Sequence, residues 1–251
     1  MAASFFVNAM QVYFASVLAM EHTGMAKMFN SLKDTRLKEF LEASGSISVA
    51  NNKLALTKDV FAEAFFLPIE ELVGFRDVPS KTVEKMQMKF SGSDVPFRAP
   101  NKKKEMKMEY RLLHDIVAKA LCANSSSFDV VTSEKIDLMV AISACLKVNW
   151  EQILFQTLVV MVHTPTKKSQ GFAVQVSFWL QNLVKADLRE IVKLHPQKVL
   201  NNTLVHTYIK NNLGVGQTGE TSRISGATTS GQQSTVVLSL FLINQRRRLV
   251  R

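Results

Sequence analysis

The order of apolar and polar residues at the start of the chain has a helical period. The first 20 positions carry no charge, and apolar residues recur there at alternating steps of four and three: Phe6, Met10, Tyr13, Val17 and Met20. Residues with this spacing share one face of an α-helix. The pattern predicts a helix over residues 4–29 that packs on a core, followed by a shorter helix over residues 32–42.

An uncharged apolar stretch at this position can also be a signal peptide or a membrane anchor. A signal peptide begins with positive charge, which is missing here, and Asn8, Gln11 and Ser16 interrupt the apolar run. We therefore expect a core helix, no association with a membrane, and an intracellular protein. The pattern does not distinguish nucleus from cytoplasm.

The next segment changes from a helical to an alternating period. In residues 47–56 apolar side chains alternate with polar ones around an Asn-Asn pair, which tolerates the positive φ of a tight turn, so a small β-hairpin is expected. Thr57 then caps a predicted helix over residues 58–66. Pro68 ends this helix, because the residue before a proline is pushed out of helical geometry.

The most regular apolar pattern lies near the middle of the chain. Its members are again separated by four and three residues, while nearby lysines fall on other faces: Met106, Tyr110, Leu113, Val117 and Ala120. This spacing predicts an amphipathic helix that ends near Cys122. The proline-rich residues 68–100 before it are expected to be irregular, except for a helix from its cap Ser80 to Phe90.

Two further helices are expected after this one. Thr132 precedes a helical pattern, and Asn149 with Gln152 has the spacing of a capping box for a second helix. That second helix is apolar on most sides, which is typical of a central position. We therefore expect residues 153–162 in the middle of the core.

The last part of the chain divides into helical and low-complexity sequence. Residues 172–194 are expected to form one long or two broken helices, and Asn202 caps a last helix that ends at Leu213. Residues 214–251 begin with a stretch rich in Gly, Ser, Thr and Gln. Such sequence buries too little apolar surface to offset its ordering entropy, which predicts a disordered C-terminal tail.

These elements predict a mainly α fold: an irregular helical domain with one small β-hairpin near 47–56, and a disordered tail. The helical domain covers residues 1–213. Its parts are expected to be N-terminal helices in 1–45, a hairpin, a helix and irregular chain in 46–100, and a helical core in 101–213. At 47% hydrophobic and 21% charged residues, the composition is that of a chain with a packed core.

The chain is basic, with a formal net charge of +10 and a pI near 9.6. Such a charge favours phosphate backbones or other anionic surfaces. The best candidate for phosphate contact is a cluster of basic residues at the start of the predicted central helix: Lys102, Lys103, Lys104, Lys107 and Arg111. The alternative is that this cluster is only a solvated face, since most charge runs are.

Tests for catalytic and cofactor motifs are negative. Residues 214–219 have the spelling G-x-G-x-x-G, but a dinucleotide site needs a strand before the glycines and a helix after them. The chain has no phosphate-loop lysine motif, no H-E-x-x-H zinc motif and no G-x-S-x-G nucleophile elbow. We expect no catalytic residue, no cofactor, no metal site and no small-molecule substrate, and therefore no enzyme.

The histidines and cysteines do not form a recognisable site. The five histidines are scattered, and His114 and Asp115 occupy adjacent helix positions, which point about 100° apart. His114 is therefore expected at the surface or its boundary. Cys122 and Cys145 belong to no C-x-x-C pair, so they are expected to be free thiols in the core.

Three segments resemble a family of repetitive, uncharacterised plant transposon proteins that are associated with retrotransposon sequence. The segments are 51–68 with its "K-x-A-L-T…F-x-LP" stretch, 110–150 with "V-T-S-E-K" and "L-K-V-N-W", and 171–188. The resemblance covers about residues 1–213. Its motifs are structural, so it implies kinship and brings no catalytic residues with it.

Two functions are consistent with the sequence. The first is a non-enzymatic protein derived from a plant transposable element, gag-like or accessory, that associates with itself or with nucleic acid. The alternative is a basic helical module that binds nucleic acid non-specifically through the 102–111 face. Salt dependence separates them, because phosphate binding weakens as salt rises.

Overall fold

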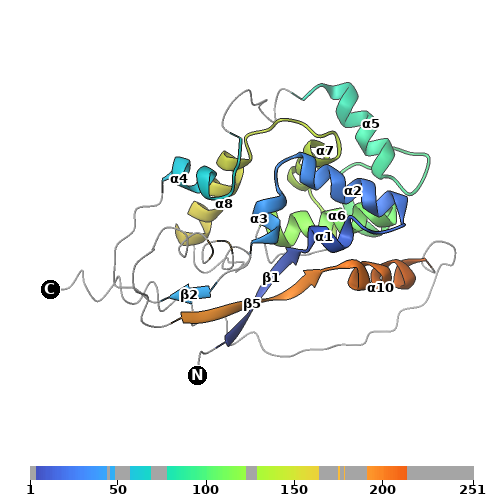
Figure 1. The fold of residues 1–251 in the computed structure, drawn as a ribbon. Coiled ribbons are helices and arrows are strands. Elements are labelled where there is room, and N and C mark those ends of the chain that lie inside the picture. The colour runs from blue at the N-terminus through green and yellow to red at the C-terminus, as the bar shows by residue number, and fades with distance from the viewer. Residues whose placement is uncertain are drawn as a thin grey trace. The chain divides into compact units, whose positions relative to one another are not determined.

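The chain is described by a computed structural model, and most of the described residues are helical (Figure 1). The described residues are 4–43, 46–48, 57–68, 78–122, 129–163, 175, 178 and 191–213. The predicted mainly α fold class is confirmed. Residues 1–212 form one unit and residues 213–251 another. The predicted disordered tail and its G-x-G-x-x-G sequence, over 214–251, lie outside the described residues.

The single helix predicted over residues 4–29 is wrong, because its first part is a strand and the rest is divided between two separate helices. Ser4–Val12 is strand β1, which pairs in parallel with β5 (Ile191–Leu200), so that Met10 lies opposite Lys198. A short apolar run without strict alternation fits a strand or a helix, so periodicity alone does not decide between them. The partner strand lies about 190 positions further along the chain, where local periodicity cannot reveal it.

The N-terminal helices follow this strand. They are α1 (Phe14–Val17), α2 (Thr23–Asp34) and α3 (Lys38–Glu42). Arg36 adopts a φ of 64°, in the left-handed region, and separates α2 from α3. The predicted end of the second helix at residue 42 is confirmed, whereas the break before it lies further along the chain than expected.

Strand β5 is the middle strand of a three-stranded sheet with the order β1-β5-β2. The short strand β2 (Ser46–Ser48) pairs with β5 in the antiparallel direction. Most of the hairpin predicted near 47–56 lies outside the described residues. The helical prediction for 172–194 is wrong at its end, where residues 191–194 belong to β5, and most of the remainder of that range is not described.

Several predicted helix starts are confirmed within one residue. Thr57 caps α4 (Lys58–Ala64), because its Oγ1 accepts a hydrogen bond from the Val60 N–H at 3.4 Å. Helix α5 (Ser80–Phe90) has Ser80 as its first residue rather than as its cap. Helix α10 (Asn202–Asn212) also begins one residue early, with its first turn capped by the preceding asparagine side chain.

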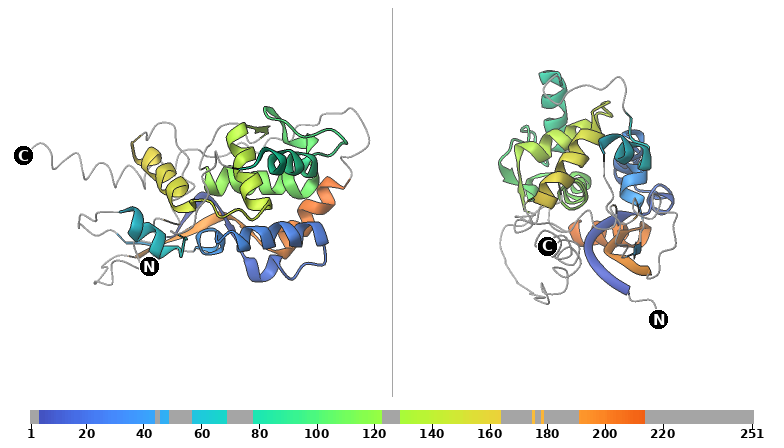
Figure 2. Two further views of the ribbon diagram at one scale, coloured as in Figure 1. Left: turned by 90° about the horizontal axis from the view of Figure 1, so that it is seen from above. Right: turned by 90° about the vertical axis from the view of Figure 1, so that its left-hand side faces the viewer.

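The core is built around two helical segments. One is α6 (Met108–Ile116), which continues into a π-helical turn, η3 (Val117–Leu121), and the other is α7 (Ser133–Ser143). All five residues of the apolar stripe predicted at 106–120 are buried, as expected. Figures 1 and 2 show the helices α2 to α8 gathered on one side of the β1-β5-β2 sheet.

Helix α8 (Trp150–His163) begins as predicted but does not occupy the centre. The Asn149 Oδ1 atom accepts a hydrogen bond from the Gln152 N–H at 2.8 Å, which confirms the cap. Leu158 is buried, but Val160 is 51% exposed, so the prediction of a central helix is wrong. Apolar composition does not reveal which neighbours cover a helix. In the described part of the chain, no helix is long and apolar enough to cross a membrane.

An aromatic cluster joins α3, α4 and α8. The Phe61 ring lies 5.0 Å from Phe65 and 5.8 Å from Phe155 between centroids, and Phe65 lies 5.1 Å from Phe40 in an edge-to-face arrangement. Beside the cluster, the Glu151 carboxylate is fully buried and its Oε1 lies 3.2 Å from the Lys58 Nζ. These contacts connect elements that are far apart in sequence.

Truncation of Phe61 should destabilise the fold strongly. Phe61→Ala removes a ring that is only 2% exposed and touches three other rings, so we expect a loss of about 3–5 kcal/mol in the free energy of unfolding. Phe66→Ala is the matched control, because Phe66 is 75% exposed and should change stability by less than about 0.5 kcal/mol. Urea unfolding of both variants measures the difference, and equal losses would contradict the cluster.

The two thiols differ in exposure, which corrects the expectation of two core cysteines. Both are free, but Cys145 is exposed and Cys122 is half-buried. Burial raises the pKa of the Cys122 thiol to about 12. The apolar sequence before Cys145 ends with α7, and the chain leaves the core there.

One thiol should therefore react much faster than the other. With a maleimide added to the folded chain, we expect rapid labelling of Cys145 and slow labelling of Cys122, because the thiolate is the reactive form. Peptide mass spectrometry at successive times measures the two rates. Cys145→Ser should abolish the fast phase, and a fast phase that persists in this variant would refute the assignment.

Candidate anion-binding site

The basic residues predicted to contact phosphate do not lie on one helix. They occupy strand β3 (Asn101–Lys102), the 3-10 turn η2 (Lys103–Glu105) and the region where α6 begins: Lys102, Lys103, Lys104, Lys107 and Arg111. Strand β3 pairs with β4 (Val130–Val131) in a two-stranded sheet. The chain passes from a strand into a 3-10 turn here, so the side chains of neighbouring lysines point in different directions.

The structure divides the five residues into two groups. Lys102, Lys104 and Lys107 are exposed, and we call them the exposed lysine group. Lys103 and Arg111 are half-buried. The Lys103 Nζ lies 2.8 Å from an oxygen of the Asp115 carboxylate, and the Arg111 Nε donates a hydrogen bond to a backbone carbonyl at 2.6 Å.

Asp115 is the acidic partner of the half-buried Lys103. Its side chain is only 15% exposed, and its Oδ1 accepts the hydrogen bond from Lys103. Burial alone would raise the pKa of Asp115, but the contacts with His114 and Lys103 and the charge of Lys119 outweigh it and hold the pKa below its ordinary value. Asp115 is therefore a carboxylate that the fold keeps ionised away from water.

His114 lies beside this carboxylate and is fully buried, which corrects the expected surface position. Its Nδ1 is 3.7 Å from the Asp115 Oδ1, beyond hydrogen-bonding distance. Neither imidazole nitrogen has a hydrogen-bond partner among the described residues. His114 is buried because α6 is covered on more sides than its apolar stripe indicates.

Polar residues on α6 and η3 recur at steps of four and share roughly one face: Arg111, Asp115 and Lys119. Lys198 of β5 and Tyr208 of α10 interact electrostatically with this segment. Burial lowers the pKa of the Lys119 amine, the charge of Lys198 lowers it further, and Asp115 opposes this shift. Burial, and then the charge of Asp115, raise the pKa of the Tyr208 phenol. These electrostatic interactions connect side chains of the α6–η3 segment, β5 and α10.

We call this set of interacting side chains the polar seam. It consists of side chains contributed by η2, α6, η3, β5 and α10: Lys103, Arg111, Asp115, Lys119, Lys198 and Tyr208. Sequence reasoning found Lys103 and Arg111 but missed the other cations. The four-residue spacing of polar residues in an otherwise buried helix was the available signal for Lys119. No local signal points to Lys198 or Tyr208.

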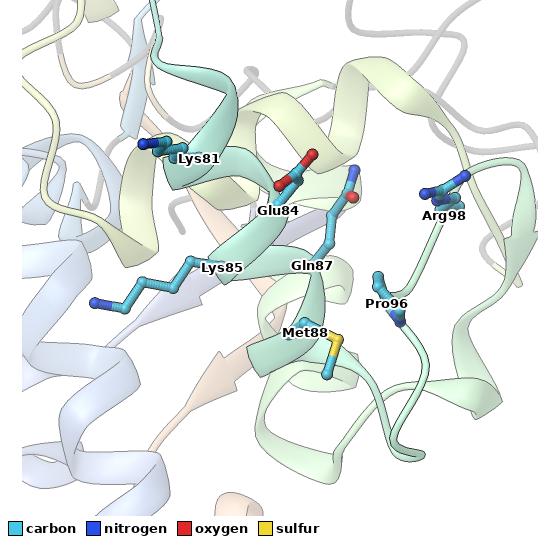
Figure 3. A pocket seen from close by; sticks show the side chains of 7 residues that line it. All are labelled: Lys81, Glu84, Lys85, Gln87, Met88, Pro96 and Arg98. Carbon is cyan, nitrogen blue, oxygen red and sulfur yellow. The ribbon is translucent and has the colours of Figure 1, made fainter.

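A second polar region lies between α5 and the loop that follows it (Figure 3). It is an open hollow of about 550 Å³, lined by Lys81, Glu84, Lys85, Gln87, Met88, Pro96 and Arg98. In Figure 3 the side chains of Glu84 and Gln87 extend on the side of Arg98, whereas Lys81 and Lys85 extend away from it. Three cationic side chains and one carboxylate line the hollow, and the cations are not gathered at one point.

The described residues contain no group of three or more His, Cys, Asp or Glu side chains that could hold a metal ion. Comparisons of the chain with protein-family models, with curated proteins and with solved structures give no match. The fold and the site therefore define the chain only as a mainly helical domain with a basic surface and a half-buried polar seam.

Removal of Lys103 should destabilise the fold in a pH-dependent manner. Lys103→Met takes away the closest cation of Asp115, and a hydrogen bond to a charged group contributes about 1.5–3 kcal/mol, so a loss of that size is expected at neutral pH. Since the folded pKa of Asp115 is lowered, its stabilising effect is complete above the unfolded carboxyl pKa of about 3.9 and disappears as the pH falls through the folded value.

The measurement is urea unfolding of the wild type and of Lys103→Met at neutral and at acidic pH. The difference between the two chains should shrink when Asp115 becomes protonated. Lys104→Met is the control, because Lys104 is 66% exposed and its 4.0 Å approach to Glu105 contributes little. A loss in Lys103→Met that stays constant down to acidic pH would show that the ion pair is not its cause.

Proposed function

We propose that this protein is a non-enzymatic nucleic-acid-binding domain that contacts phosphates through the exposed lysine group. The observation that carries the proposal is the exposure of Lys102, Lys104 and Lys107 within six consecutive positions. Lysine amines on a surface can approach successive phosphates without rearrangement of the core. The net charge of +10 supports the proposal, because it would attract a polyanion over longer distances.

Binding of this kind is expected to be non-specific. Lysine is a flexible point charge, and it lacks the planar fork with which arginine reads guanine edges. Arg111 is the one arginine of the basic cluster. It is half-buried, and its Nε already donates a hydrogen bond to a backbone carbonyl. The proposed domain would therefore bind the backbone of DNA or RNA and discriminate little between sequences.

The proposal predicts a measurable salt slope. For three phosphate contacts on duplex DNA the logarithmic slope of affinity against salt is about −2.7, which weakens binding roughly 40-fold between about 50 mM and about 200 mM salt. Lys102→Glu/Lys104→Glu/Lys107→Glu should lose most of this binding and most of the slope. Fluorescence anisotropy of a labelled duplex, at several salt concentrations, measures both quantities.

A matched control keeps the overall charge change constant. Lys27 and Lys33 of α2 and Lys210 of α10 are also exposed, so Lys27→Glu/Lys33→Glu/Lys210→Glu changes the net charge equally at other places. This variant should keep most of the affinity. Equal losses in both variants would mean that net charge alone attracts nucleic acid, and no binding at low salt would refute the function.

The biological setting is part of the proposal. The three segments that resemble plant transposon proteins support an origin in a plant transposable element, with a gag-like or accessory role. Terminal repeats or polymerase remnants beside the gene would support this origin. If nucleic acid does not bind and sedimentation shows concentration-dependent oligomers, self-association replaces nucleic-acid binding as the proposed activity.

A further inference from the structure

Helix α5 carries a row of lysines that the proposed function does not use. Lys81, Lys85 and Lys89 recur at steps of four, so they share roughly one side of the helix, and all three are exposed. Met86 and Phe90 of the same helix are buried. Figure 1 shows α5 at the edge of the group of helices, and in Figure 3 Lys81 and Lys85 extend away from the hollow. We call these three residues the α5 lysine row.

The α5 lysine row does not stabilise the helix that carries it. The ion pairs among the described residues include none of its three amines. Like charges four residues apart repel each other, and a cation in the first turn, where Lys81 lies, opposes the helix dipole. Glu84 is the one acidic residue of α5, and its side chain extends on the side of Arg98 (Figure 3). Lysines gathered along a helix in this way are typical of a surface that binds a polyanion.

Backbone contacts connect the α5 lysine row to the exposed lysine group. The Lys107 N–H donates a hydrogen bond to the Phe90 carbonyl at 2.9 Å, at the C-terminal end of α5. The Gly92 N–H donates another to the Glu105 carbonyl at 2.8 Å, and a Cβ atom on Gly92 would lie 3.0 Å from that oxygen. Lys89 is therefore the sequence neighbour of the residue that Lys107 contacts, and both lysine side chains are exposed. The two sets of lysines meet at this end of the helix.

The segment that contains both sets is strongly basic. Residues 80–107 include eight Lys or Arg against three Asp or Glu, an excess of five, and the whole chain has a net charge of +10. Half of the net charge therefore comes from 28 of the 251 residues. Of these basic side chains, Lys103 is paired with Asp115 and belongs to the polar seam.

We propose that the α5 lysine row and the exposed lysine group form one surface that binds duplex nucleic acid. The inference rests on the proposed function, and it adds a second set of phosphate contacts and the class of nucleic acid. A helical rise of about 1.5 Å per residue puts Lys81 and Lys89 about 12 Å apart along the axis of α5. A duplex has one charge per about 1.7 Å of its axis, twice the density of one strand, so a row of fixed length meets more phosphates on a duplex.

The same surface is less suited to a single strand or to a membrane. Proteins that bind single strands stack the bases on aromatic side chains, but the aromatic residues of the segment 78–122 are all buried: Phe90, Phe97 and Tyr110. A helix that lies on a membrane inserts its apolar face into the lipid, whereas Met86 and Phe90 of α5 belong to the core. The surface therefore presents mainly charge, which matches the regular backbone of a duplex.

Neutralisation of the α5 lysine row in the full chain tests the inference. Lys81→Gln/Lys85→Gln/Lys89→Gln should weaken the binding of a labelled duplex about tenfold or more at about 100 mM salt, and should reduce the logarithmic salt slope by about 2.7. The wild-type slope should be steeper than the value of about −2.7 for the exposed lysine group alone, and should approach about −5.4 for six contacts. Fluorescence anisotropy at several salt concentrations measures both quantities. A single strand of the same sequence should bind the wild type more weakly than the duplex.

Three further variants separate the charge of the row from the fold and from the net charge. Lys81→Arg/Lys85→Arg/Lys89→Arg keeps the charge and the helix propensity, so it should bind the duplex like the wild type. Lys27→Gln/Lys33→Gln/Lys210→Gln removes equal charge from other exposed positions and should keep most of the affinity. The row variants should unfold at the urea concentration of the wild type, because the side chains are exposed. The single change Lys85→Gln should reduce the salt slope by about 0.9.

Failure of this inference differs from failure of the proposed function. If Lys102→Glu/Lys104→Glu/Lys107→Glu weakens duplex binding but Lys81→Gln/Lys85→Gln/Lys89→Gln keeps the affinity and slope of the wild type, only the inference is overturned. If the wild type binds no nucleic acid at low salt, both are overturned. Equal or tighter binding of the single strand would overturn the assignment to a duplex. Tighter binding of phosphatidylserine vesicles than of the duplex would assign the surface to a membrane instead.

Discussion

Burial of the segment α6–η3 is the constraint on which the rest of the structure depends. Residues of this segment face the core on most sides, yet the sequence places Asp115 and Lys119 within it. An ion that leaves water loses several kcal/mol of hydration unless a partner compensates for it. The fold meets this requirement for Asp115 with Lys103, whose Nζ lies 2.8 Å from the carboxylate although the neighbouring lysines are exposed.

The polar seam depends on the parallel pairing of β1 with β5, which brings the first and the last parts of residues 1–212 together. Lys198 lies opposite Met10 in the register of this pair, and α10 with Tyr208 begins directly after β5. The pairing of the two strands therefore brings Lys198 and Tyr208 toward a helix about 80 positions earlier in the chain. A domain without this pairing would keep the exposed lysines and lose the seam.

Sequence reasoning succeeded where the evidence is local. The stripe on α6, the Thr57 and Asn149 caps and the ends of several helices depend on residues within one or two turns, and the structure agrees with them. It failed for Ser4–Val12, because an uncharged apolar stretch satisfies both periods and only its distant parallel partner decides between them. The burial of His114 and the position of α8 were missed for the same reason. The spacing of nearby residues does not show which distant segments cover a side chain or a helix.

The lysine run shows how the same limit affects the reading of a site. Its net charge was visible in the sequence, but the passage from β3 into the 3-10 turn exposes Lys102 and Lys104 and directs Lys103 to Asp115. Neighbouring lysines thus differ: two are exposed, and one compensates a buried charge. A charge run in an irregular segment should therefore be divided by the direction of each side chain before its charge is assigned to a partner.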